Sequence, residues 1–380
     1  MFRKMPVFLV IVILFFLCFG NFIPLCVNQL LYAISISIKS IIIFLLPFII
    51  FGLLFKTALQ LAEYAAYVII SIFFTVCVSN FISTFLSHYV GMLIYHFDFS
   101  IVFTANTRQL TPLWFFELPS IISNDKAMMF GIIIGIIMGV FKLNIGHVIV
   151  KILDTSITKI LHILTYLIPL FITGFIAKLT FDDTINIIIS HYWLIFIIVA
   201  CAQCMYIAFF YLIVNNFHIS EFLRNIKNMF PAAITGFSTM SSAAAMPFTI
   251  IGVENNCKNK DIARAVVPAT VNIHLVGDCI AIPIFAYAIL KSYLVPEPSI
   301  VQYSIFTFYF VLAKFSVAAI PGGGIIVMLP ILEKHLGFNT DMMSLITTLY
   351  VLFDPIITCV NVLGNGAFAK LIDKIKLFKR

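Results

Sequence analysis

Four polar residues recur in the last long apolar stretch of the chain, which covers residues 350–369. They are Asp354, Thr358, Asn361 and Asn365, and spacings of four, three and four residues place them on one face of an α-helix. A polar face on a membrane-spanning helix is costly unless it faces protein or a water-filled cavity, so the pattern indicates the path of a solute. The alternative is a seam of hydrogen bonds between packed helices. The carboxylate of Asp354 favours the solute path.

The composition of the chain is that of a membrane protein. Of its 380 residues, 62% are hydrophobic, 10% are charged and 41 are phenylalanine, whereas a soluble domain carries about 25% charged residues. One membrane-spanning helix needs about 20 apolar residues. We therefore expect an all-α integral membrane protein, with roughly eight or more crossings packed as one bundle and no soluble domain.

The net charge of +7 arises from 23 basic and 16 acidic residues, and its placement follows the positive-inside rule rather than forming a nucleic-acid patch. Basic residues lie near both termini, which are expected in the cytoplasm, while the pair Asp182-Asp183 falls in a connection expected outside. The stretch from Met5 to Gly20 has the composition of a secretory signal, but without a clear cleavage pattern it favours a retained first helix. The eight cysteines have no metal-binding spacing, and we expect no disulfide framework, metal or cofactor. The basic residues in alternate connections are Lys142, Lys151, Lys159, Arg224, Lys227, Lys258, Lys260 and Arg264.

Apolar runs and their polar boundaries predict eight helices. The expected ranges are 6–26, 29–56, 66–96, 127–142 with an irregular continuation to 155, 156–181, 188–215, 263–292 and 340–376.

Two further apolar runs are interrupted in the middle. Residues 228–253 contain a segment from Gly236 to Pro247 with four hydroxyl residues, and the segment from Ala318 to Gly324 contains one proline followed by three glycines. In a helix, each glycine costs about 1 kcal/mol relative to alanine and proline about 3 kcal/mol. Non-helical backbone at membrane depth is tolerated only where protein buries it or it lines a cavity. Both segments are therefore predicted to be re-entrant hairpins whose tip amides can hold a carboxylate, the alternative being ordinary helices kinked by proline.

Four motifs in these regions are Ser241-Ser242-Ala-Ala-Ala-Met-Pro247, Pro268-Ala-Thr-Val, Ile320-Pro321-Gly-Gly-Gly324 and Asp354-Pro-Ile-Ile-Thr358-Cys-Val-Asn361-Val-Leu-Gly364. In sequence, order and spacing they resemble the motifs of the dicarboxylate/amino acid:cation symporter family, which includes the excitatory amino acid transporters. Weaker matches from Ile38 to Pro47 and at Pro169 extend the resemblance over nearly the whole chain.

The resemblance implies eight transmembrane helices plus two re-entrant hairpins, built from inverted repeats and assembled as a homotrimer. It also implies an elevator-type transporter, in which a mobile transport domain slides against a fixed scaffold. The scaffold would comprise residues 1–65, with helices 1–2, and residues 97–182, with helices 4–5. Helix 3 in residues 66–96 and the whole of residues 183–380 would form the transport domain.

The resemblance also implies a set of substrate-binding residues. The first hairpin, with Ser241 and Ser242, and the second, with the backbone of Ile320, Pro321 and Gly322, would hold the α-carboxylate of an amino acid. The last helix would bind its amino group through Asp354, and Thr358 and Asn361 would complete the site. The chemistry of the residues agrees, because a carboxylate on a bundle-facing stripe suits a cation and hairpin amides suit an anion.

The chain departs from acidic-substrate members of the family at two positions. Ile357 stands where those members carry an arginine, so no guanidinium can form a bidentate pair with a side-chain carboxylate. Asp278 follows Gly277 where the family usually has threonine near the substrate side chain. These changes favour a neutral or cationic amino acid over aspartate and glutamate, although burial could instead keep Asp278 protonated.

Further departures affect the cation sites that the resemblance implies. Val276 and Asn365 stand where family members have sodium-binding aspartates, Leu275 replaces a methionine, and Lys314 stands near a sodium site. Sodium coupling is therefore doubtful. His274 and Asp278, four residues apart on one expected helix, could form a proton relay with Lys314, the alternative being a self-compensating polar cluster. The residues expected to take part in ion coupling are His274, Asp278, Lys314 and Asn365.

The sequence thus predicts a secondary active symporter or exchanger of amino acids in a bacterial inner membrane. Its partners would be the amino acid, a coupling proton or sodium ion, membrane lipid and other copies of the chain. Three alternatives remain at this point: a sodium- or proton-coupled dicarboxylate or glutamate symporter, an uncoupled channel-like relative, and an intramembrane hydrolase that uses Ser241 or Ser242. The hydrolase would need a base and an oxyanion site, and the sequence offers only hydroxyls beside small residues.

Overall fold

A computed structural model describes residues 11–12, 14–16, 18–63, 66–96, 110–119, 121–122, 124–182, 184–317 and 322–375. The regular elements in these ranges are all helices, which confirms the expected all-α class for the described part of the chain. After the one-turn helix η2 (Gly20–Phe22), the longer helices are α2 (Leu25–Glu63), α3 (Ala66–His96), α4 (Asn124–Val140), α5 (Asn144–Phe181), α6 (Thr184–Val214), α7 (Ile219–Thr239), α8 (Ser242–Asn256), α9 (Lys260–Thr270), α10 (Val276–Ser292), α11 (Ile300–Lys314), α12 (Gly323–Leu336) and α13 (Thr340–Ile375).

Three described helices are long and apolar enough to cross a membrane, namely Ser71–His96 within α3, Tyr192–Val214 within α6 and Thr340–Ile375. The predicted total of eight crossings stays a prediction. Shorter apolar segments occur at Leu25–Ile41, Pro47–Lys56, Met129–Val140, Pro169–Lys178 and Ile300–Lys314.

The expected helix over 66–96 coincides with α3, and those over 188–215 and 340–376 differ from α6 and α13 by a few residues at their ends. The break expected at residues 155–156 is wrong, because α5 runs unbroken from Asn144 to Phe181. Its polar residues there find partners: Asp154 forms an ion pair with Lys56 of α2 at 2.7 Å, and the Thr155 hydroxyl donates to the carbonyl of Lys151 in its own helix. The polar run therefore marks a contact with α2 and not a helix end.

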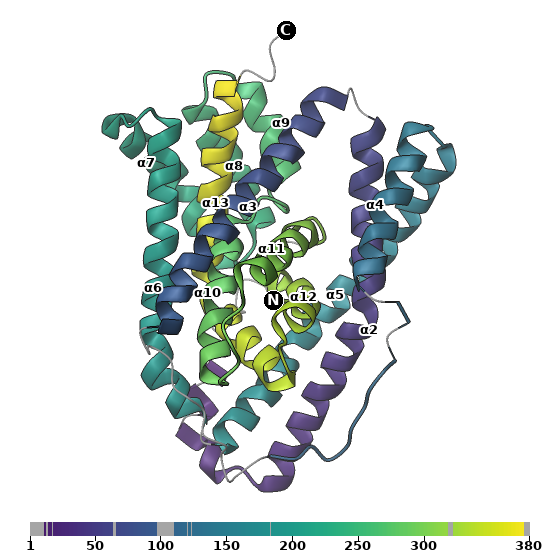
Figure 1. Cartoon of the computed structure of the whole chain (residues 1–380), viewed down its shortest axis with the longest axis vertical. Helices are drawn as coiled ribbons and strands as arrows, with labels where there is room; N and C mark the ends of the chain where they lie inside the picture. Colours follow the sequence, from purple (N-terminus) through teal and green to yellow (C-terminus); the bar gives the residue numbers. More distant parts are fainter. Residues whose placement is uncertain are drawn as a thin grey trace.

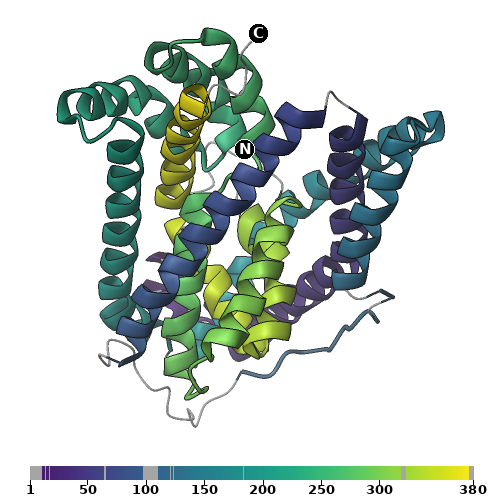
Figure 2. The same ribbon diagram turned by 45° about the horizontal axis from the view of Figure 1, so that its top comes forward.

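Helices α2, α4 and α5 pack together on one side of the molecule, on the right in Figure 1. The Ser35 hydroxyl of α2 donates to the carbonyl of Phe171 in α5 at 2.6 Å. Residues 110–119 run outside this group as an extended segment (Figure 2). This segment is fixed to α2 where Trp114 and the backbone amide of Leu118 donate to serine side chains, Ser37 and Ser40.

The close approach of α4 to α2 depends on two glycines, Gly131 and Gly135, spaced four residues apart. A Cβ atom at Gly131 would lie 2.8 Å from the carbonyl oxygen of Phe51, and one at Gly135 would lie 2.7 Å from the carbonyl oxygen of Phe55. Small residues at this spacing let two helix backbones approach closely in a membrane, where apolar side chains alone give no driving force for association.

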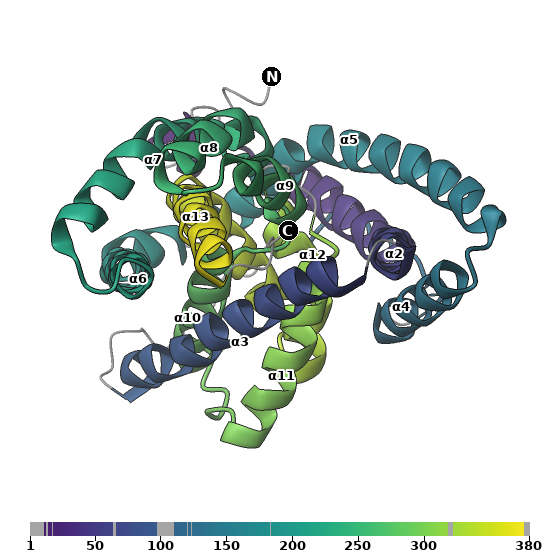
Figure 3. The same ribbon diagram turned by 90° about the horizontal axis from the view of Figure 1, so that it is seen from above.

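Helix α10 lies in the interior of the bundle and packs against α3, α6 and α13, and α3 crosses over from the side of α6 toward α2 (Figure 3). Its residues are buried on all sides, as expected for a helix that is apolar all round. The exception is Lys291, in the last turn. The single helix expected over 263–292 is wrong, because the chain leaves helical geometry between Thr270 and Val276 and forms α9 and α10 as separate helices.

Both interrupted segments form pairs of helices that contact each other. Helix α7 ends where Met240 adopts the left-handed conformation, with φ of 50°, and Ser241 caps the N-terminus of α8 by accepting from the amide of Ala244. In the second pair, α11 and α12 lie side by side and Gly322, with φ of 73°, precedes α12. Residues 318–321, which include the predicted site residues Ile320 and Pro321, lie outside the described residues.

We predict that Gly135→Val lowers the stability of the purified protein by roughly 1–3 kcal/mol, because the larger side chain must overlap the backbone of α2. The measurement is the midpoint of thermal unfolding in detergent. Ile136→Phe is the control, since it adds volume on the same helix at a position that is 45% exposed. An unchanged midpoint for Gly135→Val would contradict the close packing of α2 and α4.

Candidate functional site

The main chain between α9 and α10, residues 271–275, is not helical although it lies in the interior of the bundle. Its exposed peptide groups are satisfied by amide side chains of two other helices. Asn80 of α3 donates to the carbonyl of Ile273 at 2.7 Å and accepts from the amide of Leu275 at 3.3 Å. Asn365 of α13 donates to the carbonyl of His274 at 3.3 Å. These bonds make the irregular backbone tolerable in an apolar bundle.

The first turn of α10 is held in the same way. The amide of Gly277 donates to Asn361 Oδ1 at 2.8 Å, and the carbonyl of Gly277 accepts from Gln203 of α6 at 2.9 Å. A Cβ atom on Gly277 would overlap the carbonyl oxygen of Ile357 in α13. Only glycine therefore lets α10 and α13 approach this closely at the start of α10.

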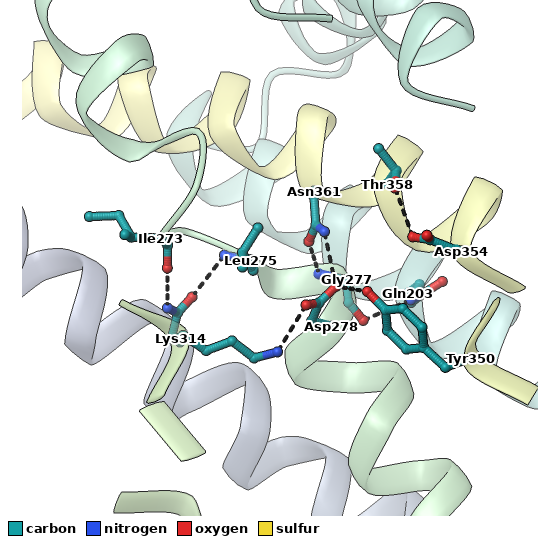
Figure 4. Close-up of polar contacts among 11 residues, drawn as sticks. Gln203, Ile273, Leu275, Gly277, Asp278, Lys314, Tyr350, Asp354, Thr358 and Asn361 are labelled. Carbon is teal, nitrogen blue, oxygen red and sulfur yellow. Dashed lines mark hydrogen bonds and ion pairs between the residues drawn. The ribbon is translucent and has the colours of Figure 1, made fainter. Parts of the chain in front are cut away.

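Asp278 follows in the same turn and is at the centre of a buried polar group (Figure 4). Its Oδ2 lies 2.9 Å from the ammonium of Lys314, whose side chain is fully buried. Its Oδ1 accepts from the Tyr350 hydroxyl at 3.2 Å and from Asn361 Nδ2 at 3.1 Å. The N-terminus of α10 adds the favourable field of a helix dipole for an acidic residue.

Asp354 forms a second, smaller group one turn further along α13 from Tyr350. Its Oδ2 accepts from the backbone amide of Gly322 at 3.0 Å, and its Oδ1 accepts from the Thr358 hydroxyl at 3.0 Å (Figure 4). Only 3% of Asp354 is exposed. The carboxylate is thus within reach of the second helix pair while it remains attached to α13.

A cavity of about 30 Å³ lies between these two carboxylates. The N-terminal ends of α8, α10 and α12 all contribute to its wall, and helix N-termini carry unpaired amides and a partial positive charge that suit an anion. Its volume holds a few water molecules at most and is too small for an amino acid. The lining residues are Met240, Ser242, Val271, Asn272, Leu275, Asp278, Val317, Gly324, Tyr350, Asp354, Thr358 and Asn361.

The structure brings Ser242, Asp278, Asp354, Thr358 and Asn361 to one cavity. Ser241 stands beside it as the N-cap of α8, and Gly322 contacts Asp354. Asn365 does not line the cavity. Besides the carbonyl of His274 it binds Asn361 and Thr270, so it is a structural amide in the described contacts.

The expected relay of His274, Asp278 and Lys314 is not assembled. α10 begins at Val276, so the helical spacing that placed His274 and Asp278 on one face does not exist. His274 instead contacts Ser79 of α3 at 2.9 Å through Nε2 and stacks near Phe368, with 4.5 Å between ring centroids. Among the described residues no hydrogen bond or ion pair joins His274 to Asp278 or Lys314. Only the Asp278–Lys314 part of the expected cluster is present.

Four polar residues of the site were missed in the sequence: Asn80, Gln203, Tyr350 and Asn272, the last of which lines the cavity. The signal for the first two was available, because each is an amide in the middle of an apolar stretch, where a polar side chain needs a partner inside the bundle. Tyr350 begins the polar stripe of α13, one helical turn before Asp354, and its hydroxyl extends the stripe by one position.

The chain matches the model of the sodium:dicarboxylate symporter family over residues 6–375 and therefore belongs to this family, as its motifs predicted. Together with its long apolar helices, this identifies it as an integral membrane protein.

Individual relatives match over shorter stretches. Excitatory amino acid transporter 2 of Mus musculus is 29% identical over 171 residues, which are 44% of this chain and 29% of that protein. The excitatory amino acid transporter of Onchocerca volvulus is 29% identical over 150 residues, 39% of this chain and 30% of that protein. Excitatory amino acid transporter 1 of Ambystoma tigrinum is 29% identical over 153 residues, which are 40% of this chain and 27% of that protein. The matched part thus spans less than a third of each relative.

We predict that Asn361→Leu lowers thermal stability by roughly 2–4 kcal/mol, because it leaves the Gly277 amide and one lone pair of Asp278 without their partner. Thr347→Val is the control on the same helix, since the buried Thr347 hydroxyl bonds only to Met343 in its own helix. Unfolding of both purified variants would be followed in detergent. Equal, small effects of the two changes would show that Asn361 does not hold α10 to α13.

Proposed function

We propose that this protein is a secondary transporter of amino acids with uncharged side chains. The observation that carries the proposal is the cavity between Asp354 and the N-terminal ends of α8 and α12, because it offers a carboxylate for an ammonium group and helix N-termini for a carboxylate. A free amino acid carries both groups. Family membership and the names of the relatives, which are amino acid transporters, support a free amino acid as the substrate.

The amino group is proposed to bind Asp354. Among the described residues this carboxylate accepts from two neutral donors, the Gly322 amide and the Thr358 hydroxyl. An ammonium would add a hydrogen bond in which both partners are charged, so that its charge compensates that of the buried carboxylate. Its entry would compete with the Gly322 amide and free that amide for the substrate carboxylate, near Ser241 and Ser242.

The charges around the cavity disfavour an acidic side chain. No arginine or lysine belongs to the described lining of the cavity. Ile357, at the position where the family resemblance implies an arginine in acidic-substrate members, is buried in the apolar core. A side-chain carboxylate would lie among Asp278 and Asp354 with no exposed cation to pair with it.

A cationic side chain gains little as well. Asp278 was expected to attract it, but its charge is compensated by Lys314 at 2.9 Å and by two further hydrogen bonds. The Asp278–Lys314 pair therefore carries almost no net charge. The sequence predicted amino acids with neutral or cationic side chains, and this pairing favours the neutral ones.

We further propose the domain arrangement that the family resemblance implies. Helices α2, α4 and α5 would act as the scaffold, and α3 with α6 to α13 as the moving unit that carries the substrate. The grouping of α2, α4 and α5 in Figure 1 supports this division. A homotrimer with cytoplasmic termini is part of the same proposal, and size measurement of the protein in detergent tests the trimer.

Uptake by purified protein in liposomes tests the substrate class. We expect neutral amino acids such as alanine, serine and leucine to compete for uptake at lower concentrations than aspartate, glutamate, lysine or arginine, because Asp278 is already paired. Preferential competition by a dicarboxylate at neutral pH would refute the proposal. Solute flux without competition or counter-exchange would instead indicate the channel-like alternative.

Asp354→Asn should abolish binding of the preferred amino acid while the protein stays folded, since asparagine keeps the shape but not the charge. Thr358→Val should weaken binding less, because the loss of one hydrogen bond to a carboxylate costs about 1.5–3 kcal/mol whereas leaving a buried ammonium unpaired costs more. Asp341→Asn serves as the control: this carboxylate is on the same helix but half-exposed, far along α13 from the cavity. Unchanged affinity in Asp354→Asn would remove Asp354 from the site.

A further inference from the structure

Lys314 is the last residue of α11, and its side chain is fully buried. Besides its ion pair with Asp278, its ammonium lies 4.5 Å from the centroid of the Phe310 ring, one turn earlier in α11. The aromatic face adds a favourable interaction with the cation. The ammonium is therefore held by two groups, one on its own helix and one on α10.

The atoms around Asp278 do not form a site for sodium. Hard cations such as sodium bind oxygen atoms with available lone pairs. The described partners of the Asp278 carboxylate are all donors, from Lys314, Tyr350 and Asn361, and the carbonyl oxygen of Asn361 is occupied by the Gly277 amide. Among the described residues the Lys314 ammonium is the partner of Asp278 Oδ2, so a sodium ion there would have to displace it. Removal of Lys314 would leave that oxygen available to a cation.

The electrostatic repulsion between the Lys314 ammonium and a sodium ion beside Asp278 is large by itself. A fixed unit charge about 4 Å away, at an effective dielectric constant of about 20, lowers the affinity for a cation roughly a thousandfold. Lys314 cannot diffuse away, because it is covalently part of α11. A dissociable cation therefore competes poorly for this carboxylate.

We propose that the Lys314 ammonium is the resident cation of the transport site, which compensates Asp278 in place of a dissociable ion and makes the binding site independent of sodium. The proposal concerns the charge balance around Asp278, and it does not depend on which solute the protein carries.

A consequence for coupling follows, and it rests on the proposed function. Asp278, Asp354 and Lys314 together carry a formal charge of −1, and a zwitterionic amino acid adds none. The loaded and substrate-free forms of the site then have the same net charge, so neither form needs an accompanying cation to move. Transport by exchange or by equilibration along the amino acid gradient is expected, instead of accumulation driven by sodium.

Thermal unfolding with sodium as the only added ligand tests the proposal. The midpoint would be measured in sodium chloride and in choline chloride at matched ionic strength, for the wild type and for Lys314→Met, Asp278→Asn/Lys314→Met and Lys39→Met. We expect equal midpoints in the two salts for the wild type. Lys314→Met, whose Asp278 lacks a counterion, should be stabilised by sodium with a saturable rise of roughly 3–5 °C. The double variant lacks the charges of both Asp278 and Lys314, so its midpoint should be the same in sodium chloride and choline chloride.

Lys39→Met is the matched control, because Lys39 is a buried lysine of α2 and its removal should create no response to sodium. A saturable rise in the wild-type midpoint with sodium would overturn the proposal, and so would a Lys314→Met protein that folds but ignores sodium. If Lys314→Met does not fold, the proposal is supported when the double variant folds and the wild-type midpoint is the same in both salts. If the double variant also fails to fold, the result counts against compensation of Asp278 by Lys314.

The measurement uses no amino acid, so it stands even if the substrate class is wrong. Conversely, a neutral amino acid whose uptake depends on a sodium gradient would leave the substrate proposal intact and overturn only the role of Lys314.

Discussion

The central constraint on this structure is that backbone which leaves helical geometry inside an apolar bundle must find hydrogen-bond partners within the protein. Residues 271–275 are such backbone: three of their amides donate to carbonyls of α9, and Asn80 and Asn365 bind further peptide groups from other helices. Asn361 does the same for the Gly277 amide in the first turn of α10. The polar stripe of α13 therefore has two tasks. Its first half, Asp354 and Thr358, faces the cavity, whereas Asn365 belongs to the hydrogen-bonded seam that was the alternative explanation of the whole stripe. Asn361 takes part in both, since it lines the cavity and binds Gly277.

The same break explains why Asp278 can exist where it does. Ending α9 and starting a new helix at Val276 places the N-terminus of α10 in the interior of the bundle, and a carboxylate in the first turn of a helix is favoured by its dipole. That field alone does not compensate a buried charge. Breaking a buried ion pair by removing one partner typically costs 3–5 kcal/mol, so Lys314 and Asp278 depend on each other, and their pairing ties α11 to α10.

The sequence predicted the class, the family motifs, most helix positions and the two interrupted segments, because these depend on local composition and periodicity. It failed where tertiary contacts decide. The continuous helix over 263–292 was expected because nothing local between Thr270 and Val276 forces a break, and the partners that stabilise the break lie on α3 and α13. The relay of His274 and Asp278 followed from that same false helix. The partner of Asp278 could be proposed as Lys314, but its distance depends on how α11 packs against α10, which no spacing within the chain reveals.

The two helices of the second pair are attached to the site in different ways. Lys314 anchors the end of α11 through a buried ion pair, whereas in the described part of the chain the start of α12 reaches the Asp354 carboxylate through one hydrogen bond, from the Gly322 amide. A hydrogen bond to a charged group contributes about 1.5–3 kcal/mol, less than the cost of breaking a buried ion pair. Gly324 has no room for a side chain, since a Cβ atom there would overlap Tyr350 and Asp278, so only glycine lets α12 approach these two groups. These contacts therefore tie the end of α11 to α10 more strongly than they tie the start of α12 to α13. The attachment of α12 depends instead on its apolar residues from Ile325 to Leu329, which are buried in the core.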